Sequence, residues 1–152
     1  MAYEGVTEIL NSYITSDDLK IATNRYNAAV SSNNCNASMR FEYALALTRS
    51  RYSVDQLRAI QLLEDLCVSG DNEAFRDYLY YLTIANIKLQ NYDRALACIK
   101  KFLSVEPENR QAKDLKDYID SKLFRDGMKG LAIVGGVAVA LGTAVAIAFS
   151  KK

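Results

Sequence analysis

The stretch YLTIANIKLQNYDRALACIKKFLSVEPEN, residues 81–109, decides the fold of this chain. Apolar side chains recur at helical spacing along its second half, at Leu96, Ile99, Phe102 and Leu103. Ala95 is small enough to let two helices cross closely. Pro107 ends the second helix, because proline has no amide hydrogen to donate and its ring clashes with the preceding turn. The stretch therefore predicts two short antiparallel helices.

The same stretch has the spacing of a structural repeat. Tyr92, Ala95 and Pro107 stand at the offsets of the second helix and exit turn of a tetratricopeptide repeat. A weaker copy precedes it, in which Ala59 matches Ala95 at a separation of 36 residues, whereas first-helix positions match at about 39. About three residues are therefore inserted in the first copy, and we expect them at its inner turn, around residues 50–52. An ordinary helical bundle is the alternative interpretation.

Helix signals continue through the whole of residues 15–126. Thr15 with Asp18 marks one helix start, and Ser53 with Gln56 has the spacing of a capping box. No alternating run between turn dipeptides indicates a sheet. We therefore predict an all-α fold, a six-helix bundle that contains two tetratricopeptide-like repeats. The six helices are expected near residues 16–32, 37–50, 53–68, 72–89, 92–104 and 109–126.

A short amphipathic arm at residues 1–14 precedes the bundle. Its apolar side chains share one face at helical spacing, namely Val6, Ile9, Leu10 and Tyr13.

The repeats predict a concave face lined by their first helices, which flanking helices would cap. By repeat position, its lining comprises Phe41, Leu45, Thr48, Arg49, Tyr80, Ile84, Ile87 and Lys88. A mostly apolar face with two basic residues suits a helical or extended peptide. Simple core packing is the alternative for each apolar member.

The C-terminal tail has the composition of a membrane span. From Gly130 to Phe149 there are twenty consecutive uncharged residues. A helix of this length covers about 30 Å, the thickness of the hydrocarbon core of a bilayer. The sequence therefore predicts one C-terminal transmembrane helix, with a buried core helix as the alternative. A stripe of small residues along it would favour helix pairing and a homo-oligomer: Ala132, Gly136, Ala140, Ala144 and Ala148.

Basic residues flank this span, with Lys129 before it and Lys151 and Lys152 after it, and we expect them to act in membrane targeting. A short, moderately apolar anchor between basic residues resembles the tail anchors of outer mitochondrial and peroxisomal membranes. The expected organisation is an arm at 1–14, a cytosolic helical domain at 15–126, a transmembrane tail anchor at 127–150 and a basic tail at 151–152.

Composition argues against several classes of function. Lys and Arg number 19 and Asp and Glu 18, so the chain lacks the basic excess of a nucleic-acid-binding protein. It contains no histidine, the commonest general base and metal ligand. Three widely spaced cysteines indicate reduced thiols without metal spacing: Cys35, Cys67 and Cys98. We expect no catalysis, no metal and no cofactor, although a hidden enzyme is kept as a remote alternative.

Taken together, the chain resembles the mitochondrial fission 1 protein family. The resemblance covers arm, repeats and anchor. It is carried by the segments RFEYALALTRSRY at 40–52, AIQLLEDL at 59–66, RDYLYYLTIANIKLQNYDRAL at 76–96, VEPENRQAKDL at 105–115 and GLAIVGG at 130–136. Ser50, Arg51 and Tyr52 resemble the Ser-Lys-Tyr insert typical of the family's first repeat, where the spacing places an insertion.

The resemblance implies a tail-anchored adaptor on the outer mitochondrial membrane and on peroxisomes, facing the cytosol. It implies recruitment of a dynamin-related GTPase, directly or through adaptor proteins, and an arm that lies over the concave groove. Ile9, Leu10 and Asn11 are the matching arm residues. The groove residues that it implies are Tyr43, Leu47, Arg49, Ser50, Arg51, Tyr52, Tyr78, Ile84, Ile87 and Lys88.

Two groove positions depart from the family pattern. Ile87 stands where some members have Tyr, and Lys88 where they have Arg. Lysine cannot make the bidentate contact of arginine, so partner preference can differ. The alternative function is a tail-anchored tetratricopeptide receptor for chaperones or precursor proteins. Asp77 and Tyr81 stand where the basic clamp residues of such a receptor would fall, and they do not fit that role.

Overall fold

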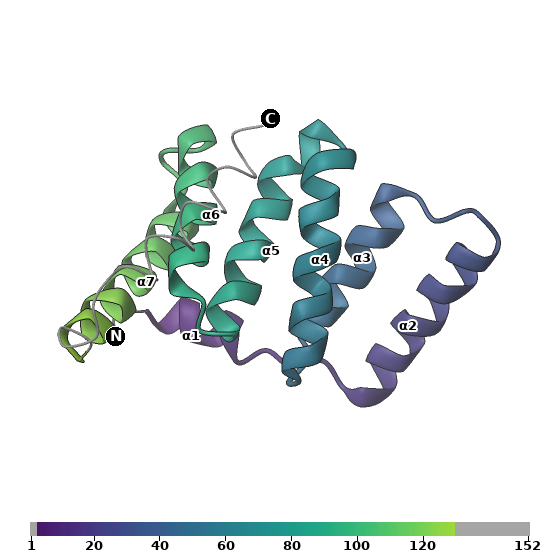
Figure 1. The fold of residues 1–152 in the computed structure, drawn as a ribbon, viewed down its shortest axis with the longest axis horizontal. Helices are drawn as coiled ribbons and strands as arrows, with labels where there is room; N and C mark the ends of the chain where they lie inside the picture. Colours follow the sequence, from purple (N-terminus) through teal and green to yellow (C-terminus); the bar gives the residue numbers. More distant parts are fainter. Residues whose placement is uncertain (1–2, 130–152) are drawn as a thin grey trace.

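The computed structural model describes residues 3–129, which form an array of α-helices with no strand among them (Figure 1). The all-α prediction is confirmed. The helices are α1 (Glu4–Leu10), α2 (Ser16–Ser31), α3 (Ala37–Thr48), α4 (Ser53–Ser69), α5 (Phe75–Lys88), α6 (Tyr92–Val105) and α7 (Arg110–Lys129), and a short 3₁₀ helix, η1 (Asn72–Ala74), leads into α5.

Each of the six predicted helices has a counterpart, and the boundaries differ by a few residues. Part of the arm forms a further helix, α1, where the sequence predicted only an amphipathic segment. At the other end, α7 continues to Lys129 instead of stopping near residue 126.

Successive helices pack against their neighbours, from α2 on α3 through to α6 on α7. Figure 1 shows this row with α2 at one end and α7 at the other. The pairs α3–α4 and α5–α6 are the two tetratricopeptide-like hairpins. Ala59 and Ala95, the small residues that matched between the two copies, are both fully buried. Their burial agrees with the close helix crossing that the sequence predicted at these positions.

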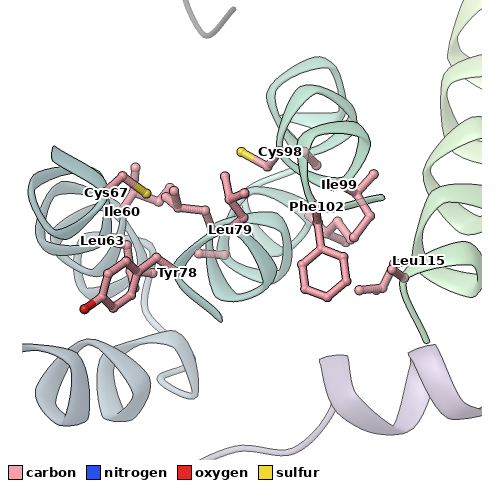
Figure 2. Packing of buried hydrophobic residues seen from close by; sticks show 14 of the residues in the cluster. Ile60, Leu63, Cys67, Tyr78, Leu79, Cys98, Ile99, Phe102 and Leu115 are labelled. Atoms are coloured by element: carbon pink, nitrogen blue, oxygen red, sulfur yellow. The ribbon is translucent and has the colours of Figure 1, made fainter. Parts of the chain in front are cut away.

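One hydrophobic core runs through the row from α3 to α7 and includes Val6 of the arm. Figure 2 shows its centre, where side chains of α4, α5, α6 and α7 meet. Leu63, Leu79, Ile99 and Leu115, one from each helix, are 0 % exposed. A smaller cluster joins α2 to the rest through Tyr43, Leu47 and Ala59.

Of the two helix-start signals, one is confirmed and the other is wrong. The Thr15 hydroxyl oxygen accepts a hydrogen bond from the Asp18 amide at 3.1 Å, so Thr15 caps α2. In contrast, the N-cap of α4 is Tyr52, without a side-chain bond, and Ser53 already lies inside the helix. Gln56 makes no capping box, because its amide reaches back across the turn to the end of α3.

The extra residues of the first repeat are distributed differently from the expectation. The turn from α3 to α4 spans residues 49–52, only one residue longer than the turn at 89–91. Most of the added length extends the start of α4, since its crossing residue Ala59 lies six positions after Ser53, whereas Ala95 lies three after Tyr92. A helical extension satisfies its own backbone hydrogen bonds, which a longer loop would leave to water.

Between residues 3 and 129, no helix combines the length and the apolar character needed to cross a membrane. The predicted transmembrane helix, the small-residue stripe, Lys151 and Lys152 lie outside the described residues.

Candidate partner-binding site

The arm packs along the side of the row on which α3 and α5 end. Figure 1 shows α1 in purple, close to α7, with the chain continuing from it toward α2. Val6 is 3 % exposed and belongs to the main core. The Tyr3 ring meets Tyr118 of α7 edge-on, with ring centroids 5.7 Å apart. The arm is therefore docked on the helical domain.

Beyond α1, the arm is held by the ends of the two repeats' first helices. The Ile14 amide donates a hydrogen bond to the Arg49 carbonyl at 3.0 Å. The Tyr13 ring lies 4.6 Å from the Arg51 guanidinium carbon and 5.1 Å from the Lys88 ammonium nitrogen, measured from the ring centroid. Both cations are attracted by the negative face of the ring. One aromatic side chain thus links the arm to the ends of both hairpin turns.

A cleft of about 330 Å³ lies between the arm and these helix ends. We call it the arm cleft, and its lining residues are Leu10, Asn11, Tyr13, Ser50, Arg51, Ser53, Gln56, Ile87, Lys88, Leu89, Gln90, Tyr92, Tyr118 and Lys122. Arg51, Lys88 and Lys122 bring positive charge, and none of the lining residues carries a carboxylate. The arm cleft is therefore a polar site with a positive potential.

Lys88 joins the two repeats at the arm cleft. Its ammonium donates a hydrogen bond of 2.6 Å to the carbonyl of Thr48, at the end of α3. Burial lowers the pKa of Lys88 to about 8, and the positive charge of Arg49 acts in the same direction. A cation at such a position would gain from a negatively charged group, which would offset part of the cost of its desolvation.

The turn from α3 to α4 forms a rigid wall of the arm cleft. The Gln56 side-chain amide donates to the carbonyls of Thr48 and Ser50 at 2.8 and 2.7 Å. The Ser50 hydroxyl donates to Asp55 at 2.6 Å and accepts from the Tyr52 amide at 3.2 Å. Each of these bonds fixes a backbone or side-chain group of the turn. The backbone that carries Arg51 is therefore held in one conformation.

The three residues of the predicted insert differ in their exposure at the arm cleft. Ser50 is buried, whereas Arg51 is exposed and lies over the Tyr13 ring, and Tyr52 is 67 % exposed. Arg49 is also exposed, and its backbone carbonyl holds the arm.

The structure brings only part of the predicted groove together at the arm cleft. The groove residues found there are Ser50, Arg51, Ile87 and Lys88, and two of the predicted arm residues, Leu10 and Asn11, also line it. Arg49 and Ile9 belong to the adjoining elements, and Ile9 is half-buried in α1.

Tyr43 and Leu47 lie away from the arm cleft, packed between α2, α3 and α4. Tyr43 is 4 % exposed, and its ring stacks on Tyr26 of α2 with centroids 4.3 Å apart. Its hydroxyl accepts hydrogen bonds from Thr23 and Arg58, each at 3.4 Å. Leu47 is 1 % exposed in the same cluster.

The remaining groove positions lie farther back along α3 and α5. Tyr78 is 1 % exposed and meets Phe41 edge-on at 5.1 Å. Tyr80 is half-buried and packs against Phe102 of α6. Leu45 is half-buried and Ile84 is buried. Thr48 is also buried, but it lies at the end of α3, where its carbonyl accepts the hydrogen bonds from Lys88 and Gln56.

Sequence reasoning missed eight of the residues that line the arm cleft: Tyr13, Ser53, Gln56, Leu89, Gln90, Tyr92, Tyr118 and Lys122. Tyr13 was assigned only to the apolar face of the arm, and Gln56 only to a capping box. The partners of Tyr13, which are Arg51 and Lys88, are distant in the sequence, so no local pattern indicates this contact. Within residues 3–129, no cluster of histidine, cysteine or carboxylate side chains could hold a metal ion.

Comparisons with known proteins agree with this architecture. Profiles described as the Fis1 N-terminal and C-terminal tetratricopeptide repeats match residues 39–70 and 76–128. Mitochondrial fission 1 protein of Mus musculus is 38 % identical over 147 residues, which cover 95 % of this chain and 97 % of that protein. The FIS1-related protein fis-2 of Caenorhabditis elegans is 41 % identical, over 76 % of this chain and 78 % of its own length.

A solved structure supports the fold. It is a crystal structure of yeast Fis1 in complex with an Mdv1 fragment that contains N-terminal extension and coiled coil domains. The TM-score is 0.71 at 24 % identity, and the match covers 77 % of this chain and 91 % of the yeast chain. Two repeat profiles in the expected order and a full-length relative leave one conclusion: this chain belongs to the mitochondrial fission 1 protein family.

Proposed function

We propose that this chain is a membrane-anchored adaptor in mitochondrial fission that recruits a dynamin-related GTPase, directly or through an adaptor protein. Members of its family are adaptors without catalytic activity. The relatives named above are fission proteins, and yeast Fis1 forms a complex with an Mdv1 fragment. We also propose, from the family resemblance and from the short, moderately apolar tail between basic residues, that the chain acts on peroxisomes and that its helical domain faces the cytosol.

The observation that carries the proposal is the arm cleft. It combines a docked arm with three cations, one of which is the exposed insert residue Arg51. The cleft suits an extended partner segment that brings a carboxylate to Lys88 and Arg51 and an apolar side chain to the place of Leu10. Because Leu10, Asn11 and Tyr13 of the arm form one side of this cleft, a partner must displace the arm or bind beside it, which makes the arm a competitor for the partner.

The proposed organisation has four parts. The arm at residues 1–14 covers the cleft, and the domain at 15–126 presents it. A transmembrane anchor at 127–150 fixes the domain to the outer mitochondrial and peroxisomal membranes. Lys129 and the basic tail at 151–152 flank the uncharged residues of this anchor, 130–149, and direct it to those membranes. Uncharged residues 130–149 support this anchor by their length and composition.

Localisation and organelle shape test the anchor together with the fission role. A tagged full chain and a copy that ends at Gly127 are expressed in cells that lack the native protein. We expect the full chain to coat mitochondria and shorten them, and the truncated copy to be diffuse and inactive. A full chain that coats mitochondria without changing their length would contradict the fission role and leave the anchor standing.

A charge reversal tests the cleft itself. Lys88→Glu should abolish recruitment of the GTPase to mitochondria, because it places an anion where the partner's anion binds. Lys100→Glu is the matched control, since Lys100 is exposed on α6 outside the arm cleft. Both variants must keep wild-type circular dichroism and mitochondrial localisation. Equal recruitment by Lys88→Glu and Lys100→Glu would rule out the arm cleft as the recruiting site.

A further inference from the structure

Lys88 has an amine that borders an open cleft and that its surroundings favour in the neutral form. The side chain is half-buried, and it lines the arm cleft of about 330 Å³. Burial lowers the pKa of Lys88 to about 8, and the positive charge of Arg49 acts in the same direction. At about pH 7.4, roughly one such amine in five is neutral, against about one in a thousand for an ordinary lysine. A neutral amine is a nucleophile, so Lys88 can react where an ordinary lysine is almost always protonated.

No negative charge in the arm cleft opposes the loss of this proton. Arg51 shares the Tyr13 ring with Lys88, and Lys122 lines the cleft from α7. None of the described residues that line the cleft carries a carboxylate. Asp55, in the first turn of α4, accepts a hydrogen bond of 2.6 Å from the serine hydroxyl of the turn and does not line the cleft. The cleft therefore lacks a carboxylate that would pair with Lys88 and keep it charged.

The contacts of the amine hold it in place without using its lone pair. The hydrogen bond to the Thr48 carbonyl, at 2.6 Å, needs one N–H group. An ammonium has three such groups, and the loss of one proton leaves two of them and a lone pair. The neutral amine of Lys88 thus stays bonded to the end of α3, while its lone pair can attack a group that enters the cleft. Such positioning lowers the entropy cost of the attack.

We propose that Lys88 is an acylation site, whose amine takes an acyl group from a thioester of coenzyme A without the help of an enzyme. The lone pair of the amine nitrogen attacks the thioester carbonyl carbon. A C–N amide bond forms, the C–S bond breaks, and the thiolate leaves with the electron pair of that bond. The proton released by the nitrogen protonates the thiolate, so the products are an N-acyl lysine and a free thiol. Arg51 and Lys122 attract the phosphates of coenzyme A to the cleft.

Acylation changes two properties of the arm cleft. It removes the positive charge of Lys88, and with it the attraction to the Tyr13 ring that holds the arm. It also removes the cation that the partner's carboxylate is proposed to meet, so acylation would switch recruitment off. This consequence rests on the proposed function of the arm cleft, whereas the modification itself does not. An arginine, which some family members have at this position, stays protonated and could not be acylated in this way.

Mass spectrometry measures the modification directly. The purified full-length chain in detergent is incubated with acetyl-CoA and no enzyme at about pH 7.4, and acetylation at each lysine is followed over time. Lys100 is the matched comparison in the same molecule, because it is exposed on α6 outside the arm cleft. We expect acetylation of Lys88 to be at least about 10-fold faster than that of Lys100, because its larger neutral fraction outweighs the weaker nucleophilicity of a less basic amine.

The same chain unfolded in guanidinium chloride is the control for the fold. There Lys88 and Lys100 should react at similar rates, because both are fully solvated. In the folded chain the rate at Lys88 should level off above about pH 8, whereas in the unfolded chain it should keep rising toward pH 10.5, the ordinary pKa of lysine. Equal rates at the two lysines of the folded chain, or a preference for Lys88 that persists after unfolding, would overturn the proposal.

A separate measurement tests the consequence for recruitment. Lys88→Gln is uncharged like the acylated lysine, and Lys100→Gln is its control outside the arm cleft. We expect only Lys88→Gln to lose recruitment of the GTPase to mitochondria. If Lys88 is acetylated preferentially but Lys88→Gln recruits normally, the regulatory role and the recruiting function of the cleft fall, and the acylation site stands. If Lys88→Gln loses recruitment but Lys88 is not acetylated preferentially, the proposed function stands and the acylation site is overturned.

Discussion

The ammonium nitrogen of Lys88 lies 2.6 Å from the carbonyl oxygen of Thr48, so a half-buried cation ties the end of α5 to the end of α3. The same carbonyl accepts the Gln56 amide at 2.8 Å. Two donors from different helices thus converge on one backbone oxygen. The relative position of the two repeats at the arm cleft depends on the bonds to this Thr48 carbonyl. Substitutions of Lys88 and of Gln56 therefore test how the two repeats are held together.

The titration of Lys88 should be visible in the stability of the protein. Its folded-state pKa is about 8, below the ordinary value of 10.5. Between these values the unfolded chain holds more protons than the folded one, so the free energy of unfolding gains a contribution that rises with pH. Lys88→Met removes that contribution. We expect the wild-type minus Lys88→Met difference, from urea denaturation, to rise between pH 8 and pH 10.

Tyrosines act in the opposite direction near the upper end of this window, because burial raises the pKa of Tyr78 and Tyr80. Both proteins contain them, so the subtraction cancels their effect. A difference that stays flat with pH would show that Lys88 is as well solvated in the folded protein as in the unfolded chain.

Gln56 should be far more sensitive to substitution than its exposed neighbour on the same helix. It is 3 % exposed, and Gln56→Met keeps its length but removes both hydrogen bonds to the turn. The Ser50 carbonyl would lose its donor, which costs about 1–3 kcal/mol of stability. Gln61→Met on the exposed side of α4 is the control, expected within about 0.5 kcal/mol of wild type. Equal effects in urea denaturation would contradict the bonding described for Gln56.

Helical periodicity was sufficient to predict the six helices of the bundle, because each is long enough for the spacing of its apolar residues to be recognised in the sequence. Helix α1 was harder to predict, since seven residues do not form a stable helix alone. It exists because Val6 packs into the main core. The capping-box prediction failed for a related reason: the Gln56 side chain is directed away from its own helix end, toward the carbonyls of Thr48, at the end of α3, and Ser50, in the turn that follows.

The candidate site was predictable where a family motif marks it and not where distant segments meet. Ile87 and Lys88 were identified by repeat position and Ser50 and Arg51 by repeat spacing, the family resemblance pointed to all four, and they lie together at the arm cleft. The contact of Tyr13 with Lys88 joins residues 75 positions apart, and nothing in either local sequence indicates it.

Gly70 should tolerate no side chain. A Cβ atom there would lie 2.6 Å from the Leu66 carbonyl oxygen and 2.7 Å from the Tyr78 hydroxyl. We expect Gly70→Ala to lower the free energy of unfolding by about 1–3 kcal/mol, because the chain must move to relieve both clashes. Tyr78→Phe in the same background should restore only part of this loss, since the backbone clash remains. Gly127→Ala is the control, with no atom within 4 Å of the added methyl group, and it should not destabilise the protein.

Tyr13 should control how firmly the arm is docked. Tyr13→Ala removes the ring between Arg51 and Lys88, whereas Tyr13→Phe keeps it. Two cation–π contacts of about 0.5–1 kcal/mol each predict roughly 5–30-fold faster local opening in the alanine variant. Hydrogen exchange of the Ile14 amide, which donates to Arg49, measures this opening directly. If the phenylalanine variant exchanges as fast as the alanine variant, the ring contributes nothing and the tyrosine hydroxyl holds the arm. If only alanine accelerates exchange, the same substitution should also strengthen partner binding, because less free energy is then needed to displace the arm from its cleft.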